Sequence, residues 1–557
     1  MSRVKRAIKY VVTAVVMVAA AGVFTFASRD DFGLGRNMEL LVNMMRELAT
    51  HYVDKLDPDK MMRDAANGMV GNLDPYTAYL SEEDMKEFEL ATTGKYGGIG
   101  ALIRKRGDYI VIAEPYKGSP ADRAGLKAGD KIVAIGGDDA KGFTTEQVSS
   151  RLKGDPNTNV KVTIENLFDG KRRTLNIKRE RIAIPGIAYA GMLNDSVGYV
   201  RHADFTDGCY DDMRAAIERL RTERELKGLV LDYRNNGGGI LQEAVKIVSL
   251  FTPKGTEVVS TKGRVESENK TFRTELDPLL PDVPIVVLVN GNTASSSEIV
   301  AGALQDMDRA VIMGQKSFGK GLVQSSRPIG YDAYVKMTTA KYYIPSGRCI
   351  QNIDYSEHRE SGREVADSLI REFKTRNGRK VYDGGGIMPD VSLDAEYISR
   401  FALTLYAMGI IDEFGDEYMK RHHADTIDVR RFSISDEEYE RFVEFVKERN
   451  VAYTSETRLA LDQLRRAVKA DRFEQDMEKH IADIESGLKD DTESNLRTYR
   501  DEIVESLNSH IVLRYKYSEG AVEHSLEEDK EVAEAVKLLG DLSEYHEILS
   551  SRDTRRK

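Results

Sequence analysis

The sequence has few cysteines, no clustered basic charge and no metal-ligand motif. Its 557 residues contain only two cysteines, Cys209 and Cys349, so it carries neither a disulfide framework nor a zinc signature. We expect both cysteines to be buried as small apolar side chains. A disulfide bond between them is the alternative if the chain is secreted. The net charge is −11 and the basic residues are scattered, which indicates no nucleic-acid partner. No HExxH run or comparable ligand spacing occurs, so we expect no metal and no cofactor.

Long apolar runs are also scarce, and the most informative one lies at the N-terminus. The run Tyr10–Phe26 spans 17 residues and follows several basic residues, a pattern typical of export. The basic residues are Arg3, Lys5, Arg6 and Lys9. We expect residues 1–27 to be an uncleaved signal anchor, because Thr25-Phe-Ala27 is a poor cleavage site. The alternative is a cleaved signal peptide. Either one places the protein in the bacterial periplasm or cell envelope, and the uncleaved anchor would also hold it at the membrane through this segment.

A serine and a lysine in the stretch Asn290–Gln324 are placed as a nucleophile and its base would be. Ser295 follows the apolar run Pro284–Val289, which has the length and branching of a buried parallel strand, and it begins a helical pattern. A serine at such a turn is exposed among free backbone N–H groups. Lys320 stands between two glycines, which allow close approach to other backbone. From these residues alone, an N-cap serine and a surface lysine remain an alternative.

This stretch resembles the active site of the carboxy-terminal processing (tail-specific) proteases, which use a Ser–Lys dyad. The matching residues are Ser295, Ser297, Glu298, Phe318, Gly319, Lys320, Gly321 and Gln324. The serine-to-lysine separation of 25 is also the family's, and Ser296 stands where alanine is common. The resemblance implies that Ser295 and Lys320 are catalytic and that Gln324 orients the lysine amine. It further implies supporting positions at Glu298 and Asp306.

A lysine base needs a dry environment. Only a neutral amine can accept the serine proton, and desolvation disfavours the ammonium. Apolar neighbours such as Val311, Ile312 and Leu322 could supply this setting. Histidine is the rival base, and His202 and His358 are the two histidines in the region that resembles the catalytic core.

Residues 94–180 resemble a PDZ domain. The resemblance rests on the run Gly118–Asp130, which reads Ser-Pro-Ala, then Ala-Gly-Leu, then Gly-Asp. It implies that a loop at residues 98–101 binds a terminal carboxylate through backbone N–H groups while the ligand adds as a strand. The loop residues are Gly98, Ile99, Gly100 and Ala101. The implied partners are protein or peptide substrates with free, apolar C-termini. A plain hairpin is the alternative for this loop.

A glycine-rich turn, Asp232–Ile240, follows an expected β-α-β unit that begins near Ser196. Glycines leading into a helix could bind phosphate, but the P-loop lysine and the dinucleotide spacing are absent. The turn resembles a family element, with Tyr233 in place of leucine. The resemblance implies an oxyanion hole made by Gly238 or Gly239 together with the N–H of Ser296. A tight turn that merely starts a helix is the alternative.

The chain is therefore expected to be multi-domain, α/β and α+β. We expect an N-terminal helical region (28–93), a PDZ domain (94–180), a mixed α/β serine-protease core (181–395) and a C-terminal helical domain (396–557). Within the N-terminal region, Leu73–Leu80 reads as a structural corner. The last region is charged and helical in period, which favours a solvated domain or a site for an oligomer or adaptor.

Two functions fit these patterns. One is an exported serine endopeptidase that captures protein C-termini. The other is a non-catalytic PDZ scaffold on a protease-like fold. Because decay usually removes the serine or the lysine first, the presence of both favours the enzyme.

Overall fold

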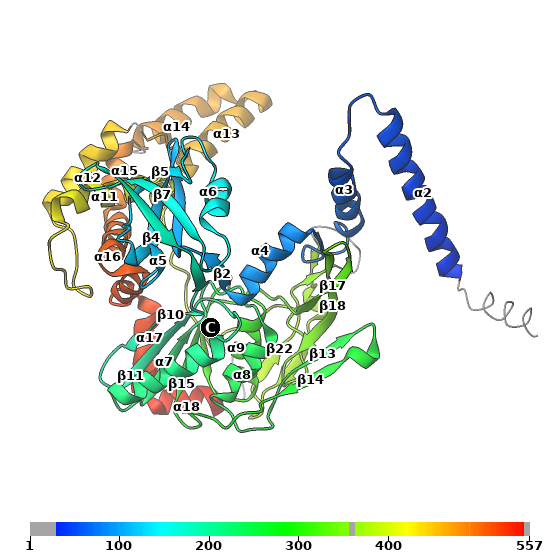
Figure 1. The fold of residues 1–557 in the computed structure, drawn as a ribbon. Helices are drawn as coiled ribbons and strands as arrows, with labels where there is room; N and C mark the ends of the chain where they lie inside the picture. Colours follow the sequence, from blue (N-terminus) through cyan, green and yellow to red (C-terminus); the bar gives the residue numbers. More distant parts are fainter. Residues whose placement is uncertain (1–28, 356–361, 450, 489–490, 551–557) are drawn as a thin grey trace, which may run out of the picture. The chain divides into compact units, whose positions relative to one another are not determined.

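The computed structural model describes residues 29–355, 362–449, 451–488 and 491–550. The expected signal segment and His358 lie outside these ranges. Within them, no helix has both the length and the apolar character that a membrane crossing requires. The chain divides into two compact units, and the smaller one comprises the residues up to Ser81, Ser326–Met337 and Tyr355–Gly362 (Figure 1).

The smaller unit contains the helices α2 (Arg29–His51) and α3 (Pro58–Val70) and the strand β1 (Ala78–Leu80). Between α3 and β1 the chain turns at Asp74, whose carboxylate accepts hydrogen bonds from the N–H groups of Tyr76 and Thr77, both at 2.8 Å. A bond of 2.9 Å from the Thr77 hydroxyl completes this corner. Strand β1 then pairs antiparallel with part of β18 (Ala333–Tyr343), with Ala78 opposite Lys336.

The larger unit begins with helix α4 (Glu82–Thr93) and continues with a segment that we call the PDZ-like unit, residues 95–183. Its main sheet has the order β3-β4-β5-β7-β8, so β3 is an edge strand. Helix α6 contacts β3. The elements are β2 (Lys95–Gly98), β3 (Ala101–Arg106), β4 (Tyr109–Pro115), α5 (Pro120–Arg123), β5 (Lys131–Ile135), β6 (Asp138–Asp139), α6 (Thr145–Leu152), β7 (Asn159–Glu165), β8 (Arg172–Lys178) and β9 (Glu180–Ala183).

The core that follows is built on a six-stranded sheet of order β10-β11-β12-β15-β16-β23. All neighbours except β10 and β11 are parallel. The expected β-α-β unit is present as β11, α7 and β12. The elements that carry the sheet are β10 (Ile187–Met192), β11 (Val197–His202), α7 (Cys209–Glu223), β12 (Gly228–Asp232), α8 (Leu241–Ser249), β15 (Ile285–Val289), α9 (Ser296–Asp306), β16 (Val311–Gly314) and β23 (Val391–Ser392).

Antiparallel strands flank this sheet. Strand β13 pairs with β14 and with the inner end of β18, and β17 pairs with β18. The remaining elements are β13 (Glu257–Gly263), a 3-10 turn (Glu266–Glu268), β14 (Lys270–Arg273), β17 (Leu322–Gly330), β19 (Ile353–Asp354), β20 (Arg363–Glu364), a second 3-10 turn (Asp367–Leu369), β21 (Glu372–Lys374) and β22 (Lys380–Tyr382).

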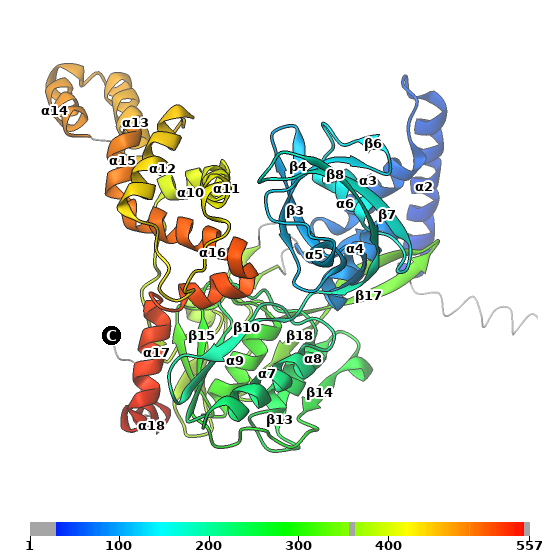
Figure 2. The same ribbon diagram turned by 60° about the vertical axis from the view of Figure 1, so that its left-hand side comes forward.

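Both faces of the parallel sheet are buried, because alternate side chains enter two different clusters. Leu229 and Leu231 pack with α7, α8 and α9, whereas Val230 packs on the other side against the helices α17 (Lys530–Gly540) and α18 (Leu542–Ser550). These two helices, red in Figures 1 and 2, are the last described elements of the chain. Helices α17 and α18 thus complete the core, whereas the sequence led us to expect one helical region over residues 396–557.

Most of the other C-terminal helices pack around a cluster that contains Phe414, Phe442 and Ile511, and two of them pack together through a separate small cluster that contains Leu461 and Ile481. This part is the expected helical domain. Its helices are α10 (Arg400–Ala407), α11 (Ile410–His422), α12 (Asp436–Glu448), α13 (Glu456–Asp471), α14 (Glu474–Gly487), α15 (Thr492–Thr498) and α16 (Arg500–Ser525). The apolar stripe of α12, with Phe442 and Val446, faces the larger cluster rather than solvent.

Asp306, at the end of α9, holds the core together. Its carboxylate accepts a bond from Arg348 at 2.8 Å and another from the N–H of Ser346 at 3.0 Å. The Asp306 and Arg348 side chains are 0% and 1% exposed. The structure therefore gives Asp306 a role in the fold, as a buried partner for a buried guanidinium.

We expect Asp306→Asn to lower the free energy of unfolding by about 3 kcal/mol or more, because it leaves the Arg348 charge buried without a counter-ion. Chemical denaturation of the purified protein measures this loss. The matched control is Glu218→Gln, which breaks a pair with Arg214 that is about half exposed and should cost less than about 0.5 kcal/mol. Equal losses in the two variants would contradict the role of Asp306.

Candidate active site

Ser295 occupies a strained turn between β15 and α9. Its backbone has φ 55° and ψ −116°, a region that side chains other than glycine rarely adopt. Ser295 is half-buried, whereas its neighbours Ala294 and Ser296 are buried. The surrounding structure fixes this conformation from both sides, since Glu298 accepts the Ser295 N–H at 2.8 Å and the Tyr342 hydroxyl donates to the Ser295 carbonyl at 3.2 Å.

The fully buried carboxylate of Glu298 organises the site. It accepts four hydrogen bonds, from Ser295 N at 2.8 Å, Ser317 Oγ at 2.5 Å, Gly319 N at 2.7 Å and Lys320 N at 2.9 Å. Burial raises the pKa of Glu298, while the hydrogen bonds from its four donors act in the opposite direction. A single side chain therefore ties the serine turn to the lysine loop.

The lysine loop reaches this position because glycine stands on both sides of Lys320. Gly319 has φ +88°, and a β-carbon there would lie 2.5 Å from the β-carbon of Asn352. A β-carbon on Gly321 would lie 2.8 Å from the Gln351 nitrogen. Both distances are too short for any other residue. The backbone N–H groups of Ser295 and Lys320 end on the same oxygen, Oε2 of Glu298, so the two predicted catalytic residues are neighbours.

Gln324 lies on β17, which follows the lysine loop. Its Nε2 donates to the Thr338 hydroxyl on β18 at 3.2 Å. The residue that the sequence predicts to orient the lysine is therefore itself oriented by the neighbouring strand.

The glycine-rich turn packs directly on the serine. A β-carbon on Gly238 would lie 2.8 Å from the Ser295 β-carbon and 2.7 Å from the Ser296 nitrogen, so only glycine leaves that N–H accessible. The Ser296 hydroxyl donates to the Gly239 carbonyl at 2.8 Å and holds the turn in place. In the described chain the N–H groups of Gly239 and Ser296 have no acceptor, whereas the Gly238 N–H donates to Asn236 Oδ1 at 2.9 Å.

Further hydroxyl groups join the serine turn to the glycine-rich turn. Thr293 donates to the Tyr233 carbonyl at 2.9 Å, and Ser297 donates to the Asn236 carbonyl at 3.0 Å. The other end of the glycine-rich turn is anchored by Arg234, which pairs with Asp529 and Glu531 at the start of α17, both at 2.7 Å. Helix α17 therefore helps to position the candidate oxyanion hole.

His202 is buried beneath this turn rather than open to a substrate. Its ring packs against Phe205 and Tyr233, with centroids 4.2 and 5.3 Å away, and its Nε2–H donates to the Asp204 carbonyl at 2.9 Å. Burial lowers the pKa of His202 to about 3. These contacts leave no accessible face for a proton transfer and disfavour His202 as the base.

The loop expected to bind a carboxylate joins β2 to β3. The Ile99 carbonyl accepts the Ala121 N–H at 2.8 Å, and the Gly100 carbonyl accepts the Ser119 hydroxyl at 2.7 Å. Position 100 requires glycine, because its φ is +75° and a β-carbon there would also lie 2.5 Å from the Ser119 β-carbon. The carbonyls of the loop are thus bound internally, while the N–H groups of Ile99 and Gly100 have no acceptor among the described residues. The Ile99 side chain lies in the core of the PDZ-like unit.

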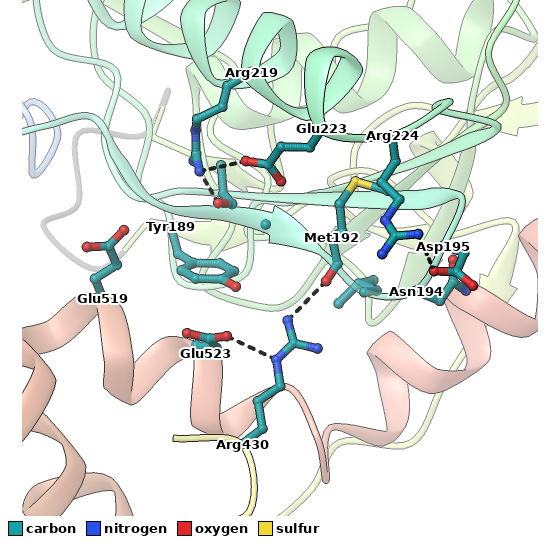
Figure 3. A pocket seen from close by; sticks show the side chains of 13 residues that line it. Tyr189, Met192, Asn194, Asp195, Arg219, Glu223, Arg224, Arg430, Glu519 and Glu523 are labelled. Atoms are coloured by element: carbon teal, nitrogen blue, oxygen red, sulfur yellow. Dashed lines mark hydrogen bonds and ion pairs between the residues drawn. The ribbon is translucent and has the colours of Figure 1, made fainter. Parts of the chain in front are cut away.

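A separate cavity of about 520 Å³ lies along the free edge of β10 and includes neither Ser295 nor Lys320 (Figure 3). Arg219 donates to the Ala190 carbonyl at 2.8 Å, and Arg430 donates to the Met192 carbonyl at 3.1 Å. Because guanidinium groups already occupy the outward carbonyls, this edge is protected against the addition of another strand.

Sequence reasoning missed Tyr342 and Arg234 as parts of the site. Tyr342 lies on β18, and nothing in its local sequence indicates which carbonyl its hydroxyl meets. Arg234 acts through residues about 300 positions later in the chain, and no local pattern signals such a contact.

We expect Glu298→Gln to destabilise the core by about 3 kcal/mol. The amide has one acceptor oxygen and turns an NH₂ group towards N–H donors, so buried donors lose their partner. Urea denaturation measures the loss, and Glu266→Gln, at an exposed position, is the matched control. A Glu298→Gln protein as stable as this control would contradict the organising role of the carboxylate.

A second prediction concerns pH. His202 stays neutral in the folded state down to about pH 3, but the unfolded chain binds a proton below about 6.5, so stability falls as the pH drops through this interval. The loss attributable to His202 should reach about 3 kcal/mol at pH 4. The slope of the unfolding free energy against pH gives the number of protons taken up on unfolding. In His202→Gln this number should decrease by roughly one between pH 4 and 6. An unchanged slope would show that His202 is charged in the folded protein.

Comparison with known families agrees with this architecture. The family models that match are peptidase family S41 at residues 196–360, a PDZ domain at 111–166, and the C-terminal helical domain of probable PDZ-proteases at 401–539. A solved structure titled photosystem II D1 C-terminal processing protease is 27% identical and covers 64% of this chain and 87% of that chain, with a TM-score of 0.33. This score is too low to support further comparison.

The curated relatives are more informative. A carboxy-terminal-processing protease of Bartonella bacilliformis is 38% identical over 314 residues, which are 56% of this chain and 72% of the relative. A probable CtpA-like serine protease of Staphylococcus aureus (strain COL) is 35% identical over 346 residues, 61% of this chain and 68% of the relative. On this similarity, the chain belongs to the carboxy-terminal-processing proteases, serine peptidases of family S41, with a PDZ domain, a peptidase core and a C-terminal helical domain.

Proposed function

We propose that this protein is an exported endopeptidase that uses Ser295 as nucleophile and Lys320 as general base on substrates captured by their C-termini. The observation that carries the proposal is the shared acceptor Glu298 Oε2, which holds the backbone of both residues at 2.8 and 2.9 Å. Two residues fixed in this way keep one relative geometry through a reaction.

The chemistry follows from this arrangement. The neutral Lys320 amine takes the proton of the Ser295 hydroxyl while Oγ attacks the substrate carbonyl carbon. The negative charge that develops on the carbonyl oxygen is stabilised by the N–H groups of Ser296 and Gly239, the two in this turn that have no acceptor. Lys320 then protonates the leaving amine, and water hydrolyses the acyl-enzyme with Lys320 again as base. Gln324 orients the amine from β17.

Capture of the substrate is assigned to the PDZ domain. The N–H groups of Ile99 and Gly100 bind the terminal carboxylate, and the tail extends the sheet along the free edge of β3. Because Ile99 is part of the domain core, the last side chain of the tail lies beside β3 and α6 rather than on an exposed Ile99. We expect tails with an apolar last residue to bind best.

Export is inferred from the basic and apolar N-terminal segment, residues 1–27, which places the enzyme in the cell envelope. Fractionation of cells that express the full chain tests this location. Recovery of the enzyme in the cytosol would contradict it.

We expect Ser295→Ala and Lys320→Ala each to lower the rate of peptide cleavage by at least about a thousandfold with the fold intact, because nucleophile and base act as a unit. Mass spectrometry of peptide products measures the rate, and circular dichroism checks the fold. Lys316→Ala is the matched control, since Lys316 is exposed in the same loop and should be dispensable. Near-normal cleavage by either dyad variant would refute the assignment.

A further inference from the structure

The PDZ domain and the helical domain meet in a compact cluster of charges. Asp412 and Asp416 on α11 pair with Arg104 and Arg106 on the edge strand β3 and with Arg514 on α16. The Arg106–Asp412 pair measures 2.6 Å, and Arg514 lies 2.7 Å from Asp412 and 2.8 Å from Asp416. In Figure 2, β3 lies at the edge of the PDZ sheet nearest to α11.

This cluster carries more positive than negative charge. Three guanidinium groups face two carboxylates, and the nearby Glu413 is already paired with Arg449 at 3.1 Å. Burial and this surplus of positive charge both lower the pKa of neighbouring basic groups. Burial, with repulsion from Arg106 and Arg514, lowers the pKa of Arg104 to about 10, and burial with repulsion from the arginines also lowers the pKa of His510 to about 4. One more anion would balance the cluster.

A cavity of about 310 Å³ opens beside this surplus. It is lined by residues 104–107 of the β3–β4 hairpin and by residues 406–409 between α10 and α11, together with Asp412, Glu413 and His510. Tyr406 and Met408 are 60% and 47% exposed and present apolar surface there. The site is therefore a positive cleft with an apolar wall, which suits a glutamate or aspartate with its aliphatic stem.

The position of the cavity relates it to the bound tail. The carboxylate loop precedes the start of β3 at Ala101, and the cavity lies at the other end of the strand, beside Arg104 and Arg106. A tail whose C-terminus sits in the loop must run antiparallel to β3, at about 3.4 Å per residue. Side chains about four to six residues before the C-terminus then reach the mouth of the cavity.

We propose that this cavity is a second recognition subsite, which takes an acidic side chain located about four to six residues before the C-terminus of the substrate. The helical domain supplies its outer wall, so a tail that fills the subsite contacts both domains. This inference rests on the proposed capture of C-termini by the PDZ domain. It adds a specificity that the carboxylate loop alone does not provide.

The test measures the affinity of fluorescent ten-residue peptides for the full-length Ser295→Ala protein, which binds without cleaving. The parent peptide ends in an apolar residue and carries one glutamate, which is moved through each position from three to seven before the terminus. We expect one or two adjacent positions to bind about tenfold tighter than the matching glutamine peptides, and the difference to shrink in high salt.

The matched protein variant is Arg104→Gln, which leaves two arginines facing two carboxylates and so keeps the domains paired. It should remove the preference for glutamate while leaving the glutamine peptides bound as before. Arg123→Gln, an exposed PDZ arginine paired with Glu180, is the control and should keep the preference. A glutamate preference that survives in Arg104→Gln would place the acidic contact elsewhere and overturn the proposal.

C-terminal amidation separates this inference from the function on which it rests. If amidated and free peptides bind equally, the capture of C-termini is wrong. If amidation weakens binding at least about tenfold but glutamate and glutamine peptides bind alike at every position, C-terminal capture stands and the second subsite is refuted.

Discussion

The buried carboxylate of Glu298 is the constraint on which the active site depends. A carboxyl group that is fully removed from water is unfavourable unless donors surround it, and here four donors do so. Since those donors belong to the serine turn and to the lysine loop, the cost of burying one charge is offset only when both segments are in place. The same bonds help to hold Ser295 in a backbone conformation that it would not adopt alone.

A second layer of bonds connects this centre to distant parts of the chain. The Tyr342 hydroxyl donates to the Ser295 carbonyl, while the Tyr342 backbone N–H donates to the Gly321 carbonyl at 2.9 Å. Arg234 connects the glycine-rich turn to α17, and α17 lies on the face of the sheet opposite to α9. The turn at the candidate site on one face is thereby connected to packing on the other, and α17 and α18 are part of the core.

The sheet edges along β10 and β3, both in the larger unit, differ in how open they are to another strand. Along β10, arginine side chains donate hydrogen bonds to the outward carbonyls, so these carbonyls cannot pair with another strand. Along β3, arginines of the same strand instead turn to the helical domain and leave the backbone edge open. The sheet edge beside the candidate carboxylate loop is therefore open, whereas the edge along β10 is protected.

The sequence by itself determined the features that depend on neighbours in the chain. Strand-to-helix spacing indicated the turn at Ser295, paired glycines indicated a close approach at Lys320, and the run Gly118–Asp130 indicated the PDZ domain. Only the tertiary structure decided that Glu298 joins serine and lysine, that Tyr342 and Arg234 belong to the site, and that α17 and α18 cover the sheet. Periodicity and turn residues report local backbone preference. The acceptor that a buried donor meets is chosen by packing between segments that lie from 22 to 297 residues apart in these examples, and no local pattern encodes that choice.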